Sequence, residues 1–76
     1  MRVKVLFFAQ FREELGVSEV RVDIPDGMRV GELANSFEFS QVPTLYALNE
    51  EFVESYAVLK EGDELALMAP VAGGSR

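Results

Sequence analysis

Near its N-terminus the chain reads RVKVLFF (residues 2–8), a β-branched and aromatic run that is typical of a β-strand. A second long apolar stretch, residues 64–69, comes from the opposite end of the chain. Because these are the two longest apolar strands that the sequence predicts, we expect them to lie side by side at the centre of one sheet. The elements between them are then expected to pack around this central pair.

Residues 19–24 alternate between charged and apolar side chains, which is the pattern of a half-buried strand. We predict that they pair with residues 2–8 in a long hairpin. Between the two strands, residues 11–16 look like one helical turn that ends at Gly16, because glycine readily adopts the left-handed conformation of a helix C-terminus. The connection between the two strands is therefore predicted to contain a short helix.

The tripeptide Pro25-Asp26-Gly27 is a turn signal, since proline fixes φ and glycine accepts a positive φ. A helix is expected to follow it. One stripe of this helix is apolar, at the spacing i, i+3, i+4 and i+7, and consists of Val30, Leu33, Ala34 and Phe37. The opposite side faces water with Glu32, Asn35 and Glu38. We therefore expect the helix to lie across one face of the sheet.

Two short strands, residues 44–49 and 52–55, are predicted on either side of Glu50-Glu51, and residues 60–63 form a turn before the last strand. The predicted order is strand, strand, helix and then three strands. This order indicates a small α+β domain with a mixed sheet and one main helix packed across it. The order alone does not distinguish among the small α+β folds that share these elements.

The composition excludes several kinds of chemistry. The 76 residues include no Cys and no His, so the chain lacks a thiol nucleophile, the usual proton shuttle and the commonest soft-metal ligands. A self-contained enzyme and a metal site are therefore not expected. The net charge of −6 disfavours nucleic acid as a partner. No apolar run approaches the roughly 20 residues that span a bilayer, and no signal pattern is present, so a cytoplasmic protein without a membrane partner is expected.

The chain ends with APVAGGSR (residues 69–76), in which an apolar strand gives way to small residues. Pro70 cannot donate to a β-ladder, and Gly73 and Gly74 carry no Cβ, so this segment can lie extended in a narrow channel. We therefore divide the chain into a domain at residues 1–69 and a flexible tail at residues 70–76. A frayed terminus without a function is the alternative interpretation.

Five stretches match one known family in the same order, namely VLFFAQFRE (5–13), PDG (25–27), ALN (47–49), EGDELA (61–66) and APVAGG (69–74). In them the chain closely resembles the small subunits of molybdopterin synthase, which are sulfur carrier proteins of the ubiquitin-like β-grasp superfamily. The resemblance covers almost the whole chain and is weakest at residues 38–43. It implies a β-grasp fold.

The resemblance also implies chemistry on the main-chain carboxyl group of Gly74. In that family an ATP-dependent activating enzyme adenylates the terminal glycine, and sulfur donated as a persulfide displaces AMP. The resulting thiocarboxylate delivers sulfur to a pterin precursor bound in the large synthase subunit. The chain would then be a non-catalytic carrier without a permanently bound cofactor, and Pro70, Val71, Ala72 and Gly73 would form the tail that carries Gly74.

The sequence departs from the family pattern at its end, because Ser75 and Arg76 follow Gly74. The free carboxylate of this chain belongs to Arg76, and Gly74 is held in a peptide bond. Three interpretations are open: a precursor that a protease trims, a non-native addition, and a domain that never carries sulfur.

Alternation along the strands predicts a docking surface. It turns Val3, Val5 and Phe7, and likewise Leu65, Leu67 and Ala69, toward the helix. It places Phe8, Phe52 and Met68 on the outer side of the sheet, away from the helix and near the tail. Aromatic residues and Met are enriched at the centres of protein interfaces, although single exposed apolar residues are also common. Arg12 lies in the first matching motif and is predicted to contact a partner, with a surface salt bridge as the alternative.

Other functions remain open at this point. A sulfur carrier for thiamine thiazole synthesis would share the fold and the tail, although the opening FFAQFRE (residues 7–13) argues against it. A ubiquitin-like modifier attached to lysines belongs to a different class, and a plain interaction domain is the third possibility. The mass of the C-terminus, and of any lysine adduct, would distinguish them.

Overall fold

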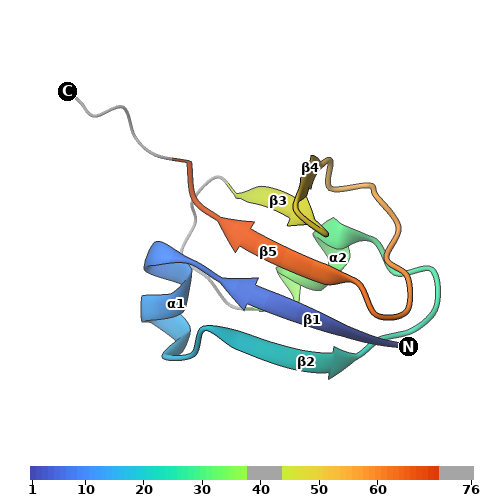
Figure 1. Ribbon diagram of the computed structural model, residues 1–76, viewed down its shortest axis with the longest axis horizontal. Helices are drawn as coiled ribbons and strands as arrows, with labels where there is room; N and C mark the ends of the chain where they lie inside the picture. The colour runs from blue at the N-terminus through green and yellow to red at the C-terminus, as the bar shows by residue number, and fades with distance from the viewer. Residues whose placement is uncertain (38–43, 71–76) are drawn as a thin grey trace.

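In the computed structural model, which describes residues 1–37 and 44–70, five strands form one sheet in the order β2-β1-β5-β3-β4 (Figure 1). The strands are β1 (Arg2–Phe7), β2 (Glu19–Asp23), β3 (Leu45–Leu48), β4 (Glu51–Val53) and β5 (Glu64–Met68), and the helices are α1 (Ala9–Leu15) and α2 (Val30–Asn35). The prediction that β1 and β5 are central neighbours is confirmed; they run parallel, and the other neighbouring strands are antiparallel. Because α2 crosses one face of this mixed sheet, the fold is the expected β-grasp.

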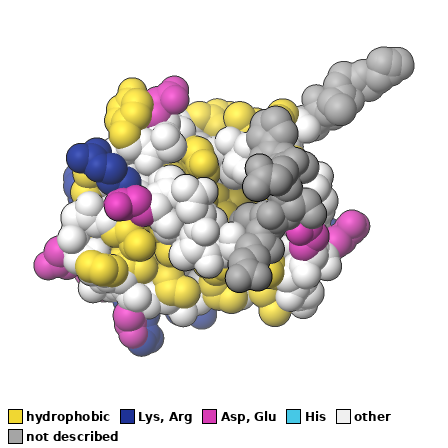
Figure 2. Space-filling model, turned by 180° about the vertical axis from the view of Figure 1, so that it is seen from behind, with side chains coloured by type: hydrophobic (Ala, Val, Ile, Leu, Met, Phe, Trp, Pro, Cys, Tyr) yellow, Lys and Arg dark blue, Asp and Glu magenta, His cyan; other side chains and the backbone are white. Residues whose placement is uncertain are grey.

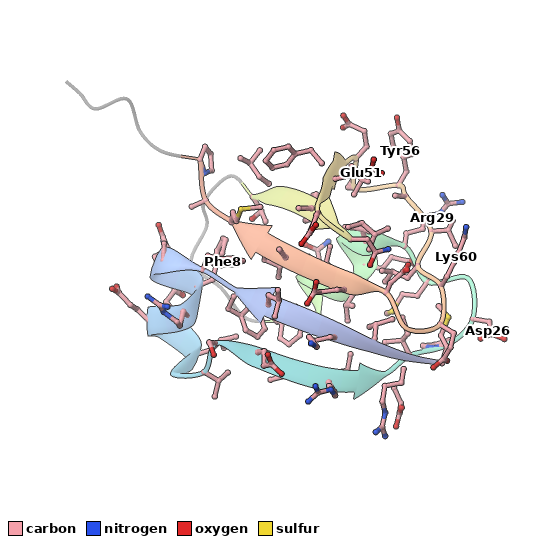
Figure 3. All side chains as sticks on the ribbon, in the orientation of Figure 1. Phe8, Asp26, Arg29, Glu51, Tyr56 and Lys60 are labelled. Carbon is pink, nitrogen blue, oxygen red and sulfur yellow. The ribbon has the colours of Figure 1, made fainter. Side chains whose placement is uncertain are left out.

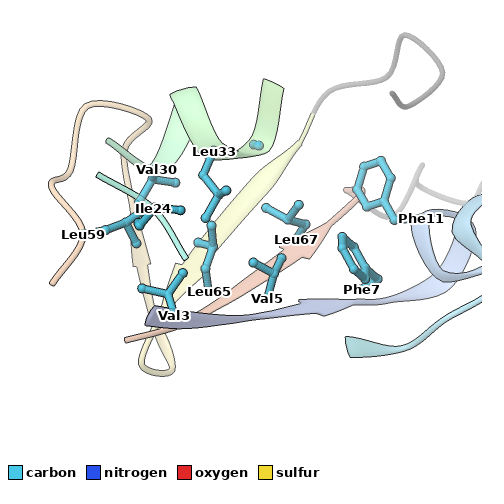
Figure 4. Packing of buried hydrophobic residues seen from close by; sticks show 11 residues of the cluster. Val3, Val5, Phe7, Phe11, Ile24, Val30, Leu33, Leu59, Leu65 and Leu67 are labelled. Carbon is cyan, nitrogen blue, oxygen red and sulfur yellow. The ribbon is translucent and has the colours of Figure 1, made fainter. Parts of the chain in front are cut away.

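The inner face of the sheet, toward α2, carries the core. Val3, Val5 and Phe7 of β1 are each 1% exposed or less, and so are Leu65 and Leu67 of β5. The register pairs Val5 with Leu65 and Phe7 with Leu67, so these side chains lie next to one another (Figure 4). Alternation along the sequence predicted this inward orientation, and the structure confirms it.

α2 packs on this face through Val30, Leu33 and Ala34, which are buried as predicted. The start of the helix is held by the segment that follows β4. The N–H groups of Val30 and Gly31 donate to the carbonyl oxygens of Ala57 and Ser55, each at 2.8 Å. Backbone N–H groups that would otherwise be unpaired at a helix start are thereby satisfied.

The prediction that the helix continues through Phe37 is wrong, because α2 ends at Asn35. Ser36 Oγ donates a hydrogen bond to the Leu33 carbonyl at 2.6 Å, and Phe37 N–H bonds to a carbonyl three residues back, at 3.2 Å. These contacts tighten the last turn and stop the helix. Phe37 nevertheless points inward, since its ring meets that of Phe7 edge-on with 5.1 Å between centroids. Glu38 lies outside the described residues.

The turn between β3 and β4 lies one residue earlier than predicted. It consists of Asn49 and Glu50, with φ of 52° and 73°, and Glu51 is already part of β4. Two-residue hairpin turns favour positive φ at both positions, and Asn tolerates it better than most residues. Asn49 is also held by its side chain, which donates to Asp63 Oδ1 at 2.9 Å and accepts from Glu64 N–H at 3.0 Å. Side-chain hydrogen bonds therefore place this turn.

The helical turn predicted between β1 and β2 is confirmed and is longer than predicted. α1 begins at Ala9 and ends at Leu15, and the next residue, Gly16, has the expected left-handed conformation with a φ of 76°. β1 consequently ends at Phe7, and Phe8 is an extended residue before the helix. Phe11 of α1 is fully buried in the same cluster as Phe7 (Figure 4), although the sequence analysis did not assign it to the core.

Candidate functional site

The outer face of the sheet, opposite α2, is not covered by any helix of the described residues (Figure 1). The strand register places Leu6 beside Ala66, Ala66 beside Ala47, and Ala47 beside Phe52. Directly opposed residues on neighbouring strands are in contact, so these side chains form a continuous apolar row. Phe52 ends the row on the edge strand and is 73% exposed.

A second apolar row lies nearer the start of the tail. Leu45 pairs with Met68 across β3 and β5, and Phe8 N–H donates to the Leu67 carbonyl at 3.3 Å, so Phe8 continues the alignment of β1 with β5. Phe8 and Leu45 are 44% and 42% exposed. We call the two rows together the outer apolar patch; it consists of Leu6, Phe8, Leu45, Ala47, Phe52, Ala66 and Met68.

The structure thus brings Phe8, Phe52 and Met68 onto one face, as alternation predicted, and their contact with a partner stays a prediction. Leu45 was not predicted to belong to this face, because only the register of β3 against β5 shows that it lies beside Met68. A continuous exposed apolar surface with a polar rim is typical of a protein interaction site. The patch is therefore the candidate site for docking.

The β1–β2 end of the same face is charged, and its charges are paired. Arg2 Nε lies 3.0 Å from Asp23 Oδ1, Lys4 Nζ lies 3.6 Å from a Glu64 carboxylate oxygen, and Arg21 lies 3.4 Å from the Glu19 carboxylate. Hydrogen bonds from Arg2, and its positive charge, lower the pKa of the Asp23 carboxyl. On the opposite side of the molecule, which carries α2, acidic and basic side chains lie mostly at the periphery (Figure 2).

Arg12 is exposed on α1, the helix that directly follows Phe8. No carboxylate of the described residues forms an ion pair with its guanidinium, so the alternative interpretation as a surface salt bridge receives no support. Arginine side chains recognise carboxylates through several N–H donors. Arg12 is thus available to an acidic group of a partner.

The tail begins directly after β5, where Pro70 is exposed two residues beyond Met68. Val71, Ala72, Gly73 and Gly74, and also Ser75 and Arg76, lie outside the described residues. What the structure places is therefore the starting point of the tail, next to the outer apolar patch.

Residues 1–37 and 44–70 contain neither a metal-binding cluster nor a membrane-spanning helix. In these ranges no group of three or more acidic, His or Cys side chains is arranged to hold a metal ion. None of the described helices is long and apolar enough to cross a membrane.

Comparisons with known proteins agree with this geometry. Residues 5–74 match the ThiS family. The chain is 37% identical, over 97% of its length and 100% of the relative, to the molybdopterin synthase sulfur carrier subunit of Chlamydomonas reinhardtii. Its fold is similar to that of SAMP1 from Haloferax volcanii, with a TM-score of 0.79, 26% identity and coverage of 97% and 100% of the two chains. It is also similar to a chain in the complex of subunits 1 and 2 of the molybdopterin-converting factor from Helicobacter pylori, with a TM-score of 0.66, 27% identity and coverage of 97% and 100%.

Proposed function

This chain belongs to the ThiS family, and from that premise we propose that it is the sulfur carrier subunit of a molybdopterin synthase. The observation that supports this most is the position of the outer apolar patch, which ends beside Pro70, where the tail begins. A carrier needs a docking surface and a reactive end. Here the docking surface directly adjoins the start of the tail that carries the reactive end. The proposed setting is the cytoplasm, where ATP is available for the activating step.

In this proposal the reactive group is the carboxyl group of Gly74. An activating enzyme transfers AMP from ATP to that carboxylate, which converts it into an acyl group with a good leaving group. The terminal sulfur of a persulfide then displaces AMP and leaves an acyl disulfide. A thiol cleaves the S–S bond of this intermediate, which forms a new disulfide with the donor and releases the thiocarboxylate that donates sulfur to the pterin precursor. A protease first removes Ser75 and Arg76, so that Gly74 becomes the terminal residue.

The proposed partner is the large subunit of the synthase, with the activating enzyme as a second partner. Support for the large subunit comes from the Helicobacter pylori relative, which forms a complex of subunits 1 and 2. The outer apolar patch would bury its apolar surface against these partners, at about 25 cal/mol for each Å² removed from water. Arg12 would contribute a charged contact at the α1 end of the patch.

A test of the tail chemistry compares a chain that ends at Gly74 with the chain that ends at Arg76. ATP–pyrophosphate exchange by the activating enzyme should occur with the first chain and not with the second, because only the first has a free glycine carboxylate. Deletion of Gly74 should abolish sulfur transfer while leaving docking intact, since it withdraws the reacting carbon by about 3.5 Å. Normal transfer by the deletion variant would refute the carrier proposal.

A second candidate is a protein modifier. The observation that favours it is the likeness to SAMP1, whose full name is small archaeal modifier protein 1. In this case the activated Gly74 would be attacked by a lysine amine of another protein instead of sulfur. Mass spectrometry of proteins from the native host separates the two functions. A thiocarboxylate terminus supports the carrier, whereas lysine adducts that carry this tail support the modifier.

A further inference from the structure

A groove of about 450 Å³ opens at the β3–β4 edge of the outer apolar patch. Its walls include Leu45, Tyr46, Phe52 and Val53, and Glu54 lies among the lining residues. Because Leu45 and Phe52 also belong to the patch, a partner that covers the patch reaches the groove without a separate contact. The groove is therefore part of the same docking event.

The charges around this groove are not balanced within the chain. No Lys or Arg occurs between Arg29 and Lys60 in the sequence. Glu54 lines the groove, whereas Glu51 pairs with Leu48 farther along β4 and is not among the lining residues. Both are exposed, and among the described residues no cation forms an ion pair with either of them. Figure 3 shows Glu51 on β4, away from Phe8 at the far end of β1.

The opposite edge of the same sheet differs in this respect. There the carboxylates of Glu19 and Asp23 already have Arg21 and Arg2 as partners. A basic group of a partner can therefore form ion pairs at the β4 edge without breaking ion pairs that already exist within the chain. Charge complementarity at this face points to a basic partner at β4.

We infer that the groove receives a lysine or arginine side chain of the protein that docks on the outer apolar patch, and that this side chain is attracted by Glu54 in the groove and, at longer range, by Glu51 on the edge strand β4. The apolar stem of such a side chain would lie along Leu45 and Phe52, because long basic side chains bury their stems and keep the charged head near water. The head would meet the Glu54 carboxylate and the exposed ring of Phe52. This inference rests on the proposed function, in which the docking protein is the large synthase subunit.

The expected effect of these carboxylates is mainly on the rate of association. Exposed charges at the rim of an interface steer the encounter and add little to the final affinity. Their effect also depends on salt, because the screening length falls from about 30 Å at 10 mM to about 3 Å at 1 M ionic strength. Association kinetics at two salt concentrations therefore measure the inferred interaction directly.

The experiment compares binding of the large subunit to the wild-type chain and to the double variant Glu51→Gln, Glu54→Gln. Glutamine keeps the shape of the side chain and removes the charge. At about 10 mM salt we expect the association rate of the variant to fall about tenfold, and at about 1 M salt we expect the two rates to agree. Charge reversal by Glu54→Lys should lower the low-salt rate further.

The matched control is the double variant Glu19→Gln, Asp23→Asn, which changes the net charge equally at the opposite edge of the sheet. It should retain an association rate within about twofold of wild type, since the partner's basic group lies at β4. Equal losses in the two double variants, or no loss in the β4 variant, would overturn the inference. If the wild-type chain does not bind the large subunit at all, the proposed function fails first, and the two failures are distinct.

Discussion

On its inner face β1 buries Val3, Val5 and Phe7 to 1% exposure or less, whereas on the outer face Phe8 at its end remains 44% exposed. The same alternation divides β5, where Leu67 is fully buried and its neighbour Met68 is only partly buried. Neighbouring positions in one strand therefore have different tasks. The inner residues stabilise the domain, and the outer residues are free to bind a partner.

The two faces should respond differently to the same chemical change. A residue removed from the inner face leaves a cavity that the rest of the core cannot fill, so the cost includes both lost burial and the cavity. A residue changed on the outer face stays in water in the isolated chain and loses solvent only in a complex. Stability and binding measurements on paired variants can therefore test whether the inner residues stabilise the domain and the outer residues bind a partner.

The largest effect is expected on the inner face. Phe7→Ala should lower the free energy of unfolding by about 3–5 kcal/mol, because the ring is fully buried and packs against Phe37. The neighbouring change Phe8→Ala should cost about 1 kcal/mol or less. Urea denaturation followed by circular dichroism measures both. Similar losses of stability at the two positions would mean that the inner face does not contribute more to the stability of the domain than the outer face.

The next effect is on binding. Phe8→Asp and Met68→Glu should each weaken docking on the large subunit by about 2 kcal/mol, or roughly 30-fold in Kd, because each buries a charge without a partner at the interface. Calorimetric titration measures the affinity, and circular dichroism should show that the variants stay folded.

Val58→Asp is the control for these variants. Val58 is 44% exposed, as is Phe8, but it pairs with Arg29 and lies outside the outer apolar patch. Its charged variant should bind the large subunit normally. Weakened binding by this control as well would show that the docking surface extends beyond the patch.

Much of this division could be predicted from the sequence, because period-two alternation is a local pattern that fixes which side chains share a face. That pattern assigned Val5 and Leu65 inward and Met68 outward. It could not locate Leu45 beside Met68, since register between strands depends on turns and hydrogen bonds elsewhere. The turn at Asn49 was misplaced for the same reason, because its position depends on hydrogen bonds to residues far along the chain.

The burial of isolated core residues could not be predicted from alternation either. Phe11 and Leu59 are fully buried, yet Phe11 lies in a short helix and Leu59 in a segment without regular structure, so neither belongs to a repeating apolar pattern. Their burial follows from tertiary packing. The tail chemistry, in contrast, was predicted from family motifs, and Gly74 lies outside the described residues.

A smaller effect is expected at the turn that joins β3 and β4, which belongs to neither face. Glu50 has a φ of 73°, which costs a residue with a Cβ roughly 1 kcal/mol relative to glycine. Glu50→Gly should therefore be about 1 kcal/mol more stable than Glu50→Ala, and both variants lack the charge. Thermal unfolding of the pair gives the difference. Equal stability would indicate that the turn relaxes without cost.

The smallest effect is expected from the charged end of the outer face, where the Asp23 carboxylate pairs with Arg2 at 3.0 Å. Hydrogen bonds from Arg2 lower the pKa of Asp23 below its ordinary value of 3.8. A lowered pKa in the folded state means that the pair stabilises the fold above the unfolded pKa, and that this contribution is lost as the pH falls through the folded pKa.

Asp23→Asn should therefore be slightly less stable than wild type at neutral pH, and the difference should shrink as the pH falls through the folded pKa of Asp23 and the wild-type carboxyl becomes protonated. The difference should also shrink at about 1 M salt, because both side chains are exposed and the pair is screened. Unfolding measured from about pH 2 to pH 7 tests this. If the difference in stability between the two proteins is constant over the whole pH range, it does not come from the charge of Asp23. The ion pair of Asp23 with Arg2 would then contribute no more to the stability of the fold than the unpaired carboxylates at the β4 edge.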